Sequence, residues 1–309
     1  MKKTVKNLSG YLSCAVPFGL IKKKQVPFLP FYHLVSNETL PHIRHLYRAI
    51  TPKIFEKHLD FYLKHFQSVT AISELGKGNG FLLSFDDGLR EVYEVVYPIL
   101  KRKGVQAVFF INSAFVGNAG LMYRYKASLL IDKMPDNPLL KKEILQIDFA
   151  HRSRIDNLLE KFEIDVDSYL KIQKPYMNLS ELKQMADDGF IIGMHGYSHS
   201  DYRQLSDEQR TEDLRKNIDW HRENFPKQPM VFAFPFTDDS IPLSFFEKMK
   251  TMGITASFGT AGIKPDVADS HFQRLPVEDY HGNIRKIAGG EFVYSAIRSI
   301  FGKNTVHRP

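Results

Sequence analysis

The sequence predicts an α/β fold in which parallel strands alternate with helices and close into a barrel. Short, fully apolar runs of strand length are each followed by a segment whose apolar residues recur at helical spacing. Strands that are apolar on both faces belong to parallel sheets covered by helices, and about six or seven such units would close into a barrel. The 309 residues, 43% hydrophobic and 25% charged, have the composition of a globular chain that can bury a large core.

From residue 26 onward the chain alternates between predicted strands and helices. The first strand lies within residues 26–35 and ends near Tyr32 and His33, and the others cover residues 81–85, 106–111, 190–194, 230–236, 254–258 and 274–277. The helices cover residues 52–66, 89–103, 178–189, 206–225 and 245–252. A mostly helical insertion over residues 117–176, which could form a lid over a site, interrupts the alternation. We therefore predict a barrel domain over residues 26–290 and a carboxy-terminal tail over residues 291–309.

Local signals support the helix bounds. Thr51 is a suitable N-cap, and Pro52 suits the first helical position because its fixed backbone angle is already helical. Gly104 ends the helix that runs to residue 103. Ser206 and Gln209 have the spacing of a capping box, in which each side chain bonds the other residue's backbone N–H.

The first 25 residues form a basic, semi-apolar segment ahead of the barrel. Its apolar stretch, residues 11–21, is too short to span a membrane, which takes about 20 apolar residues. Gly10, Ser13 and Pro17 dilute the apolar character, and three lysines follow the stretch where a signal peptide would have its cleavage site. We expect an unprocessed, cytoplasmic chain, and association of this segment with a membrane surface stays open.

The composition excludes several classes of function. A single cysteine, Cys14, excludes a disulfide framework and cysteine-based metal clusters, so a metal site here has to use histidine and carboxylate ligands. The net charge of +7 is mild for this length, and the sequence has no zinc-finger spacing or aromatic RNA-binding motif. We therefore expect no nucleic-acid partner.

Two acidic residues directly follow the apolar strand over residues 81–85. Parallel α/β folds carry their chemistry at the carboxyl ends of strands, which is where Asp86 and Asp87 lie. Neighbouring side chains on a strand face different ways, so the two carboxylates can take different roles. A solvated Asp-Gly turn is the plain structural explanation of the same residues.

Two histidines follow the strand over residues 190–194. His195 and His199 are four residues apart and would share one side of a helical turn, close enough to bind one ion. With Asp87 they form an N,N,O ligand set that leaves coordination positions for water and substrate, as in catalytic zinc sites. We therefore expect a divalent metal, zinc in the first place, and Asp86 as the base that accepts a proton from water.

These motifs resemble those of the polysaccharide deacetylases of the NodB-homology class, carbohydrate esterase family 4. The run SFDDG at residues 84–88 is similar to their T-F-D-D-G motif, and HGYSH at residues 195–199 is similar to their H-[ST]-x-x-H motif. Residues 31–35, 55–60, 231–236 and 274–277 are similar to the subgroup that acts on bacterial exopolysaccharides. The resemblance covers residues 26–280, apart from the insertion.

The resemblance implies a distorted (β/α)7-type barrel and a metal-dependent hydrolase that removes acetyl groups from a sugar or polysaccharide. Asp86 would be the general base, and Asp87, His195 and His199 would hold the metal. The partner would be an acetylated glycan or glycan precursor.

The third motif of the family corresponds to residues 231–236. By the resemblance Phe234, Pro235 and Phe236 would line one side of the sugar groove. Many members carry an arginine in this motif that orients the base, and this stretch has none. Arg274 could supply that guanidinium from a neighbouring strand.

Two further departures concern the second motif and the general acid. Gly196 stands where the family has serine or threonine. The family also uses a late histidine as general acid, often in Leu-x-His, and this string is missing. His271 and His33 are the two candidates for that role.

Two other functions stay open from the sequence. The missing arginine and late histidine motivate a barrel that binds glycan without hydrolysing it, and related barrels act on small non-sugar C–N bonds. A phosphatase of the haloacid dehalogenase type is excluded because it needs Asp-x-Asp, and position 84 is serine. No His-Glu-x-x-His or Gly-x-Ser-x-Gly string is present. A lid over the site would favour a small or lipid-linked substrate, and an open groove would favour a polymer.

Overall fold

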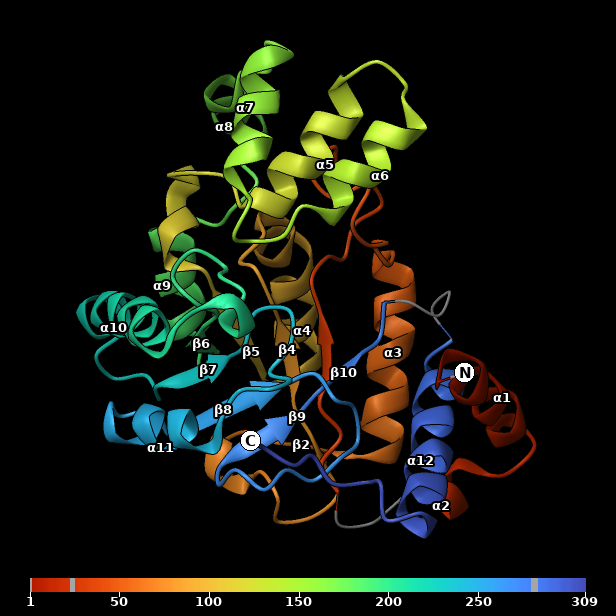
Figure 1. Cartoon of the computed structure of the whole chain (residues 1–309). Helices are drawn as coiled ribbons and strands as arrows, with labels where there is room; N and C mark the ends of the chain where they lie inside the picture. Colours follow the sequence, from red (N-terminus) through yellow and green to blue (C-terminus); the bar gives the residue numbers. More distant parts are fainter. Residues whose placement is uncertain (1, 23–25, 279–282) are drawn as a thin grey trace.

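The computed structural model describes residues 2–22, 26–278 and 283–309. Eight short strands within them form one parallel sheet in the order β10-β1-β4-β5-β6-β7-β8-β9 (Figure 1). The strands are β1 (Pro30–Tyr32), β4 (Leu83–Phe85), β5 (Ala107–Ile111), β6 (Ile191–Met194), β7 (Val231–Ala233), β8 (Ala256–Gly259), β9 (His271–Gln273) and β10 (Leu275–Pro276). A separate pair, β2 (Gln67–Ser68) and β3 (Gly80–Phe81), lies before β4 in the chain.

The sheet closes on itself through its last two strands. β9 and β10 are halves of one extended segment that is interrupted at Arg274. The first half pairs with β8, where His271 lies opposite Ser257, and the second half pairs with β1, where Leu275 lies opposite Pro30. The ring therefore has seven members, and the predicted (β/α)7-type barrel is confirmed.

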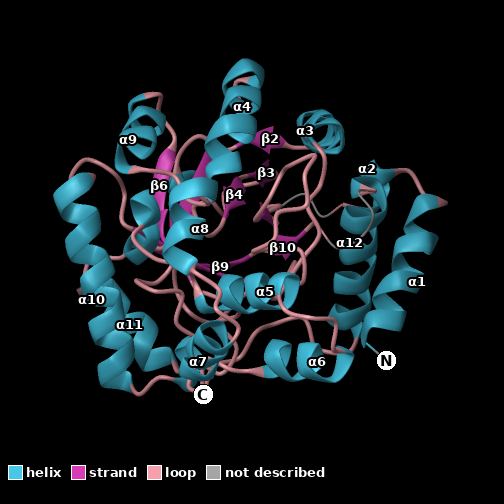
Figure 2. Cartoon of the chain, turned by 90° about the horizontal axis from the view of Figure 1, so that it is seen from above, coloured by secondary structure: helices cyan, strands magenta, loops and turns pink. Residues whose placement is uncertain are grey.

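Helices cover the outside of the ring (Figure 2). The helices around the barrel are α3 (Pro52–His65), α4 (Tyr97–Lys103), α9 (Leu179–Asp187), α10 (Asp207–Asn224), α11 (Leu243–Thr251) and α12 (Ile284–Ile300). Two helices at the amino terminus, α1 (Lys2–Cys14) and α2 (Phe18–Ile21), lie beside α12. No helix of the described residues is long and apolar enough to cross a membrane.

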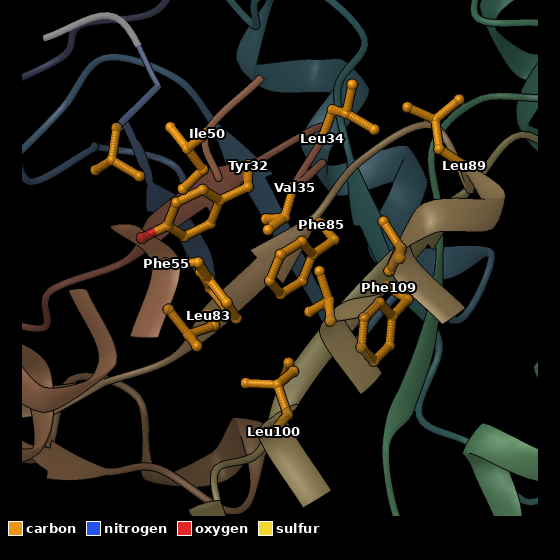
Figure 3. Close-up of a cluster of buried hydrophobic side chains, with 14 of the residues drawn as sticks. Tyr32, Leu34, Val35, Ile50, Phe55, Leu83, Phe85, Leu89, Leu100 and Phe109 are labelled. Atoms are coloured by element: carbon orange, nitrogen blue, oxygen red, sulfur yellow. The ribbon is translucent and has the colours of Figure 1, made fainter. Parts of the chain in front are cut away.

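The core between the ring and its helices follows from the alternation of side chains along each strand. Tyr32, Phe85 and Phe109 point outward from β1, β4 and β5, and their rings stack with centroids 5.4 Å apart between successive neighbours (Figure 3). Phe55 of α3 packs edge-on against Phe85, at 5.7 Å. Each such ring removes about 150–250 Å² from water, so this layer fixes how the strand ends lie relative to one another.

The strands are shorter than the sequence predicts. The first strand ends at Tyr32, close to the predicted end, but β1 begins only at Pro30, because Pro27 and Pro30 have no N–H to donate to a neighbour. The strand predicted over residues 230–236 ends at Ala233, and Phe236 already has a positive φ of 59°. The polar residues that follow the strands therefore belong to loops, which can turn their side chains towards a common centre.

The segment between β5 and β6 contains four helices that lie together above the barrel in Figure 1. They are α5 (Tyr123–Lys133), α6 (Pro138–Gln146), α7 (Ser153–Lys161) and α8 (Val166–Gln173). Their apolar residues form a small core of their own around Leu130 and Ile155. This cap lies at the carboxyl ends of the strands, where parallel barrels hold their chemistry.

The carboxy-terminal residues are part of the barrel assembly. The predicted boundary between residues 290 and 291 falls inside α12, so it separates no structural units. After α12 the chain returns to the barrel, and Val306 pairs with Asp266 in a parallel bridge. The predicted tail over residues 291–309 is thus packed against the fold.

Candidate active site

The loops that follow β1, β4, β6 and β7 surround a cavity of about 370 Å³ at the carboxyl end of the barrel. Its lining includes the four motif residues for which the sequence predicts a chemical role, namely Asp86, Asp87, His195 and His199. Leu46 and Tyr47, from the loop after β1, and Met122 and Arg124, from the cap, also line it.

Asp86, after β4, is held by the guanidinium of Arg274, which comes from the segment that closes the ring. Arg274, at the break between β9 and β10, donates to both carboxylate oxygens of Asp86, at 2.7 and 2.9 Å, and also to Ser84 Oγ at 2.9 Å. Both side chains of the pair are buried. Burial alone would raise the pKa of Asp86, but the charge and hydrogen bonds of Arg274, together with the neighbouring imidazoles, outweigh burial and hold that pKa below its ordinary value. Asp86 is therefore an ionised, oriented carboxylate.

Two aromatic rings fix the guanidinium in turn. Its central carbon lies 4.4 Å from the ring centroid of Phe31 and 5.1 Å from that of Phe110. Arg274 is 1% exposed, so these cation–π contacts are not weakened by water. The arginine that the third motif lacks thus has a counterpart on a different strand.

Asp87 lies between the two imidazoles of the second motif. Its Oδ1 atom is 3.2 Å from His199 Nε2 and 3.5 Å from His195 Nε2, and it is buried without a hydrogen-bond partner among the described residues. One carboxylate oxygen and two imidazole nitrogens therefore converge on one point. A divalent cation would satisfy them, and these three residues could hold one.

The tautomer of His195 suits a metal ligand. Its Nδ1 lies 2.9 Å from the carbonyl oxygen of Ala233 and can only donate there, which leaves Nε2 unprotonated towards Asp87. Burial lowers the pKa of His195 to about 4, so the ring is neutral at neutral pH. Burial alone would raise the pKa of Asp87, but the charge of His199 and its contact with the carboxylate, together with the charge of His33, hold that pKa far below its usual range.

The loop that carries His195 and His199 is not the helical turn that the spacing predicts. It is irregular, and Gly196 and His199 have positive φ values of 71° and 56°. A Cβ on Gly196 would lie 3.1 Å from Pro235 Cγ. Glycine therefore suits this position both because of its positive φ and because of the close approach of Pro235. The Asp213 carboxylate accepts from the backbone N–H of Tyr197 at 2.9 Å, which holds the loop.

Two tyrosines that the sequence analysis missed hold the second oxygen of Asp87. Tyr125, from helix α5 of the cap, donates to Asp87 Oδ2 at 2.6 Å, and Tyr47 bonds the Tyr125 hydroxyl at 2.5 Å. Burial raises the pKa of Tyr125 well above its ordinary value, so the phenol keeps its proton. No motif marks Tyr125, because it reaches the site from the insertion.

His33 carries a carboxylate partner. Glu278, directly after β10, lies 2.7 Å from His33 Nδ1 and accepts from the His33 backbone N–H at 2.6 Å. Burial alone would lower the pKa of His33, but Glu278 raises it to about 9. Since Glu278 takes Nδ1, the ring offers Nε2 to the cavity that His33 lines. A carboxylate at the end of the last strand was a signal that the sequence analysis did not use.

His271 lies in a different place. Its Nδ1 is bonded to Ser257 Oγ at 2.7 Å and its Nε2 to Asp238 Oδ2 at 3.0 Å, so neither nitrogen is free. Asp238 also belongs to a second buried group in which the Arg308 guanidinium bridges it to Asp266. His271 does not line the cavity that holds the two motifs, so it does not fit the role of the general acid there.

The third-motif residues differ in exposure. Phe236 is 36% exposed, lines the cavity and packs edge-on against the His199 ring at 4.5 Å. Phe234 borders the cavity but is fully buried, and its ring packs against Phe232 at 5.1 Å. Pro235 is buried and does not line the cavity. Of the three, Phe236 alone offers an exposed ring to a sugar.

Comparison with solved structures places the fold among known deacetylases. IcaB from Ammonifex degensii has a TM-score of 0.58 and 17% identity, over 87% of this chain and 97% of that chain. PplD from Streptococcus pyogenes, solved in complex with acetate, has a TM-score of 0.58 and 13% identity, over 87% and 99%. The BpsB deacetylase domain from Bordetella bronchiseptica has a TM-score of 0.51 and 15% identity, over 83% and 97%. At these identities the likeness shows a shared fold.

A search among curated proteins gave no match. Comparison with protein families did give a match, and it is more informative than the likeness of fold. The family model described as polysaccharide deacetylase matches residues 76–257, from the turn before β3 into β8. The match covers more than half of the chain and includes both motifs of the cavity. The chain therefore belongs to the polysaccharide deacetylase family, whose members are carbohydrate-deacetylating hydrolases.

Proposed function

We propose that this deacetylase hydrolyses the N-acetyl group of one sugar unit at a time, with a divalent cation, zinc in the first place, held by Asp87, His195 and His199. The observation that carries the proposal is the buried Oδ1 atom of Asp87, which faces two imidazole nitrogens and has no hydrogen-bond partner among the described residues. When bound, the cation supplies Lewis acidity, which polarises the acetyl carbonyl and makes water a better nucleophile.

Asp86 would act as the general base. A base has to be ionised before it accepts a proton, and Arg274 keeps Asp86 in that form. The guanidinium also fixes both carboxylate oxygens, so the remaining lone pairs have one orientation towards the cavity. Asp86 Oδ2 lies 3.8 Å from His195 Nε2, so the base and the cation ligands border the same space.

His33 would act as the general acid. Hydrolysis of an amide releases an amine, which has to receive a proton as the C–N bond breaks. His33 is protonated at neutral pH because Glu278 raises its pKa, and its ring stacks on Tyr47 at 4.5 Å, which fixes its orientation. A protonated acid is needed for an amide more than for an ester, so this arrangement supports an N-acetyl substrate.

The dimensions of the cavity support a single sugar unit. Its volume of about 370 Å³ is near the lower end of the roughly 300–1,000 Å³ of small-molecule sites. Tyr47 and, from the cap, Met122 and Arg124 line the cavity together with the proposed metal ligands, so the cap borders the space that a substrate would enter. A terminal or lipid-linked acetylated amino sugar fits such a roofed site better than the middle of a polymer, and Phe236 offers a ring on which it can stack.

The test is acetate release by the zinc-loaded protein. We expect release from short N-acetylated chito-oligosaccharides, loss of release after the metal is removed with a chelator, and recovery when zinc is returned. Asp86→Asn should keep the metal and lose release, whereas Asp187→Asn, an exposed carboxylate at the end of α9, should behave as wild type.

The same assay separates the proposal from its alternatives. Metal bound without acetate released from any acetylated sugar, and with Asp86→Asn equal to wild type, would favour a glycan-binding barrel. Release from internal sugars of a long polymer at the same rate as from chain ends would contradict the single-unit cavity.

A further inference from the structure

Helix α1 buries its small residues and exposes its large apolar residues. Ser9 and Ser13 are 1% and 0% exposed, whereas Leu8, Tyr11 and Leu12 are 59%, 67% and 57% exposed. Residues three and four positions apart lie on one side of a helix, so the three large side chains form one stripe. This is the reverse of an ordinary surface helix, which turns its large apolar face to the core.

Close packing against α12 holds the helix in this orientation. A Cβ on Gly289 of α12 would lie 2.4 Å from Ser13 Oγ, so the two helices approach as closely as small residues permit. Arg285 of α12 donates to the carbonyl oxygen of Ser13 at 2.7 Å, which ties down the end of α1. Rotation of α1 to bury its leucines would break both contacts.

The exposed apolar side chains continue beyond α1. Val16 is 38% exposed, and Leu20 of α2 is 79% exposed. We name the five side chains Leu8, Tyr11, Leu12, Val16 and Leu20 the outer face. In Figures 1 and 2 α1 lies at the edge of the molecule, on the side of α12 that faces away from the barrel. The described residues of the chain leave the outer face uncovered.

The charge of the segment indicates what covers it. The first 37 residues contain six lysines and no aspartate or glutamate. Lys286 of α12 adds a cation at the border of the outer face, 3.2 Å from the ring centroid of Tyr11. A second copy of the chain would bring the same positive charge against this one and would be repelled. An apolar surface on a segment with six lysines and no acidic residue matches an anionic lipid bilayer.

We propose that the outer face of α1 and α2 docks the protein on an anionic membrane surface. The leucines and Tyr11 enter the boundary between headgroups and acyl chains, and the positive charge of the segment attracts the anionic headgroups. The helices lie on the membrane and do not cross it, in keeping with their length. Docking of this kind combines weak insertion of apolar side chains with weak electrostatic attraction to anionic lipid, so loss of either one should release the protein.

The test measures co-sedimentation of the full chain with vesicles. We expect binding to vesicles of phosphatidylcholine with about one third phosphatidylglycerol and little binding to phosphatidylcholine alone. Raising the salt from roughly 0.1 to 0.5 M should weaken binding, because the charges are then screened. The variant Leu8→Ser/Leu12→Ser should bind the anionic vesicles at least about tenfold more weakly.

A matched control uses exposed apolar residues far from the outer face. Leu139 of α6 and Ile172 of α8 are 77% and 83% exposed, so Leu139→Ser/Ile172→Ser removes the same kind of surface and should bind as wild type. The thermal unfolding midpoint of each variant reports whether it is folded. If Leu8→Ser/Leu12→Ser does not fold, Lys2→Glu/Lys3→Glu/Lys6→Glu takes its place and should lose the preference for anionic lipid.

Three outcomes would overturn the inference. The first is no binding to anionic vesicles by the wild-type chain. The second is equal loss of binding in the control variant. The third is a concentration-dependent dimer without lipid that Leu8→Ser/Leu12→Ser abolishes, which would assign the outer face to a second copy. None of these depends on the metal or on acetate release, so the proposed deacetylation stands or fails separately.

Discussion

Substitution of Arg274 by alanine would remove the partner of a carboxylate that has no access to water. Arg274 and Asp86 are 1% and 2% exposed, and two hydrogen bonds of 2.7 and 2.9 Å join them. Removal of one partner from a buried, hydrogen-bonded ion pair costs about 3–5 kcal/mol, because the remaining charge is uncompensated. We therefore expect the free energy of unfolding of Arg274→Ala to fall by about 4 kcal/mol.

The same substitution should impair acetate release. Without the guanidinium Asp86 loses both its fixed orientation and the charge that keeps it ionised. Loss of a positioned base lowers the rate by about 10²–10⁴-fold. Arg274→Lys is the matched variant, because it keeps the charge but cannot donate to both oxygens in a planar fork. It should lose less stability than Arg274→Ala and have an intermediate rate.

Equilibrium unfolding in urea and initial rates of acetate release measure the two effects. A double-mutant cycle with Asp86→Asn then isolates the pair, and Asp86→Asn should cost less stability in the Arg274→Ala background than in wild type. The reasoning would be refuted by an Arg274→Ala protein within about 0.5 kcal/mol of wild type, or by additive effects in the cycle.

Three further predictions follow from the other charged groups. Glu278→Gln removes the carboxylate that raises the pKa of His33, so the alkaline limb of the kcat/KM profile should move to lower pH. His195→Ala and His199→Ala should each lose bound zinc in elemental analysis of the purified protein. Arg308→Ala should lower the thermal unfolding midpoint at neutral pH, and the difference from wild type should shrink below about pH 4, where the two carboxylates that Arg308 bridges gain protons.

Each of these has an outcome that would contradict it. An unchanged alkaline limb in Glu278→Gln would remove His33 from the acid role. Stoichiometric zinc in either histidine variant would refute the ligand set, and His271→Asn, outside the cavity, should retain the metal. A difference between Arg308→Ala and wild type that persists at low pH would mean that the stabilisation does not come from ionised Asp238 and Asp266, whose pKa values in the folded protein lie below their ordinary values.

The fold could be predicted because its signals are local. A parallel strand buried on both faces is a continuous apolar run, and Phe85 and Phe109 lie in such runs. The start of α3 was also local, since Thr51 Oγ1 accepts from Ile54 N–H at 3.3 Å as an N-cap should. Three strands end at Phe85, Ile111 and Met194 as predicted, whereas the strand predicted over residues 230–236 ends at Ala233, because the extent of pairing depends on the neighbouring strand.

The conformation of the second motif could not be predicted from its spacing. Two histidines four residues apart lie together on a helix, but a loop with positive φ values at Gly196 and His199 brings them equally close. The prediction of a helical turn was therefore wrong, although the ring centroids of His195 and His199 lie 5.0 Å apart. A metal site needs its ligand side chains close together, and the spacing of two residues in the sequence does not specify which backbone conformation brings them together.

The partners of the motif residues were the least predictable. Tyr125 reaches Asp87 from the cap, and Glu278 reaches His33 from a strand end 245 positions away in the chain. Such contacts depend on how segments far apart in sequence meet. Arg308 is a similar case, because nothing in the sequence separates a solvated terminal arginine from one that is 1% exposed between two carboxylates.

The closed ring explains how a chain without two family signals can still assemble the chemistry. Every strand of a parallel barrel ends at the same rim, so a side chain can reach the cavity from any strand. Arg274 reaches Asp86 from the last strand, and His33 reaches the cavity from the first, which is its neighbour in the ring. The absence of the arginine from the third motif, and of a late histidine, therefore does not argue for a barrel that only binds glycan. What decides between binding and hydrolysis is whether a base, an acid and the metal ligands border one cavity, and Asp86, His33 and Asp87, which we propose for these roles, line one cavity.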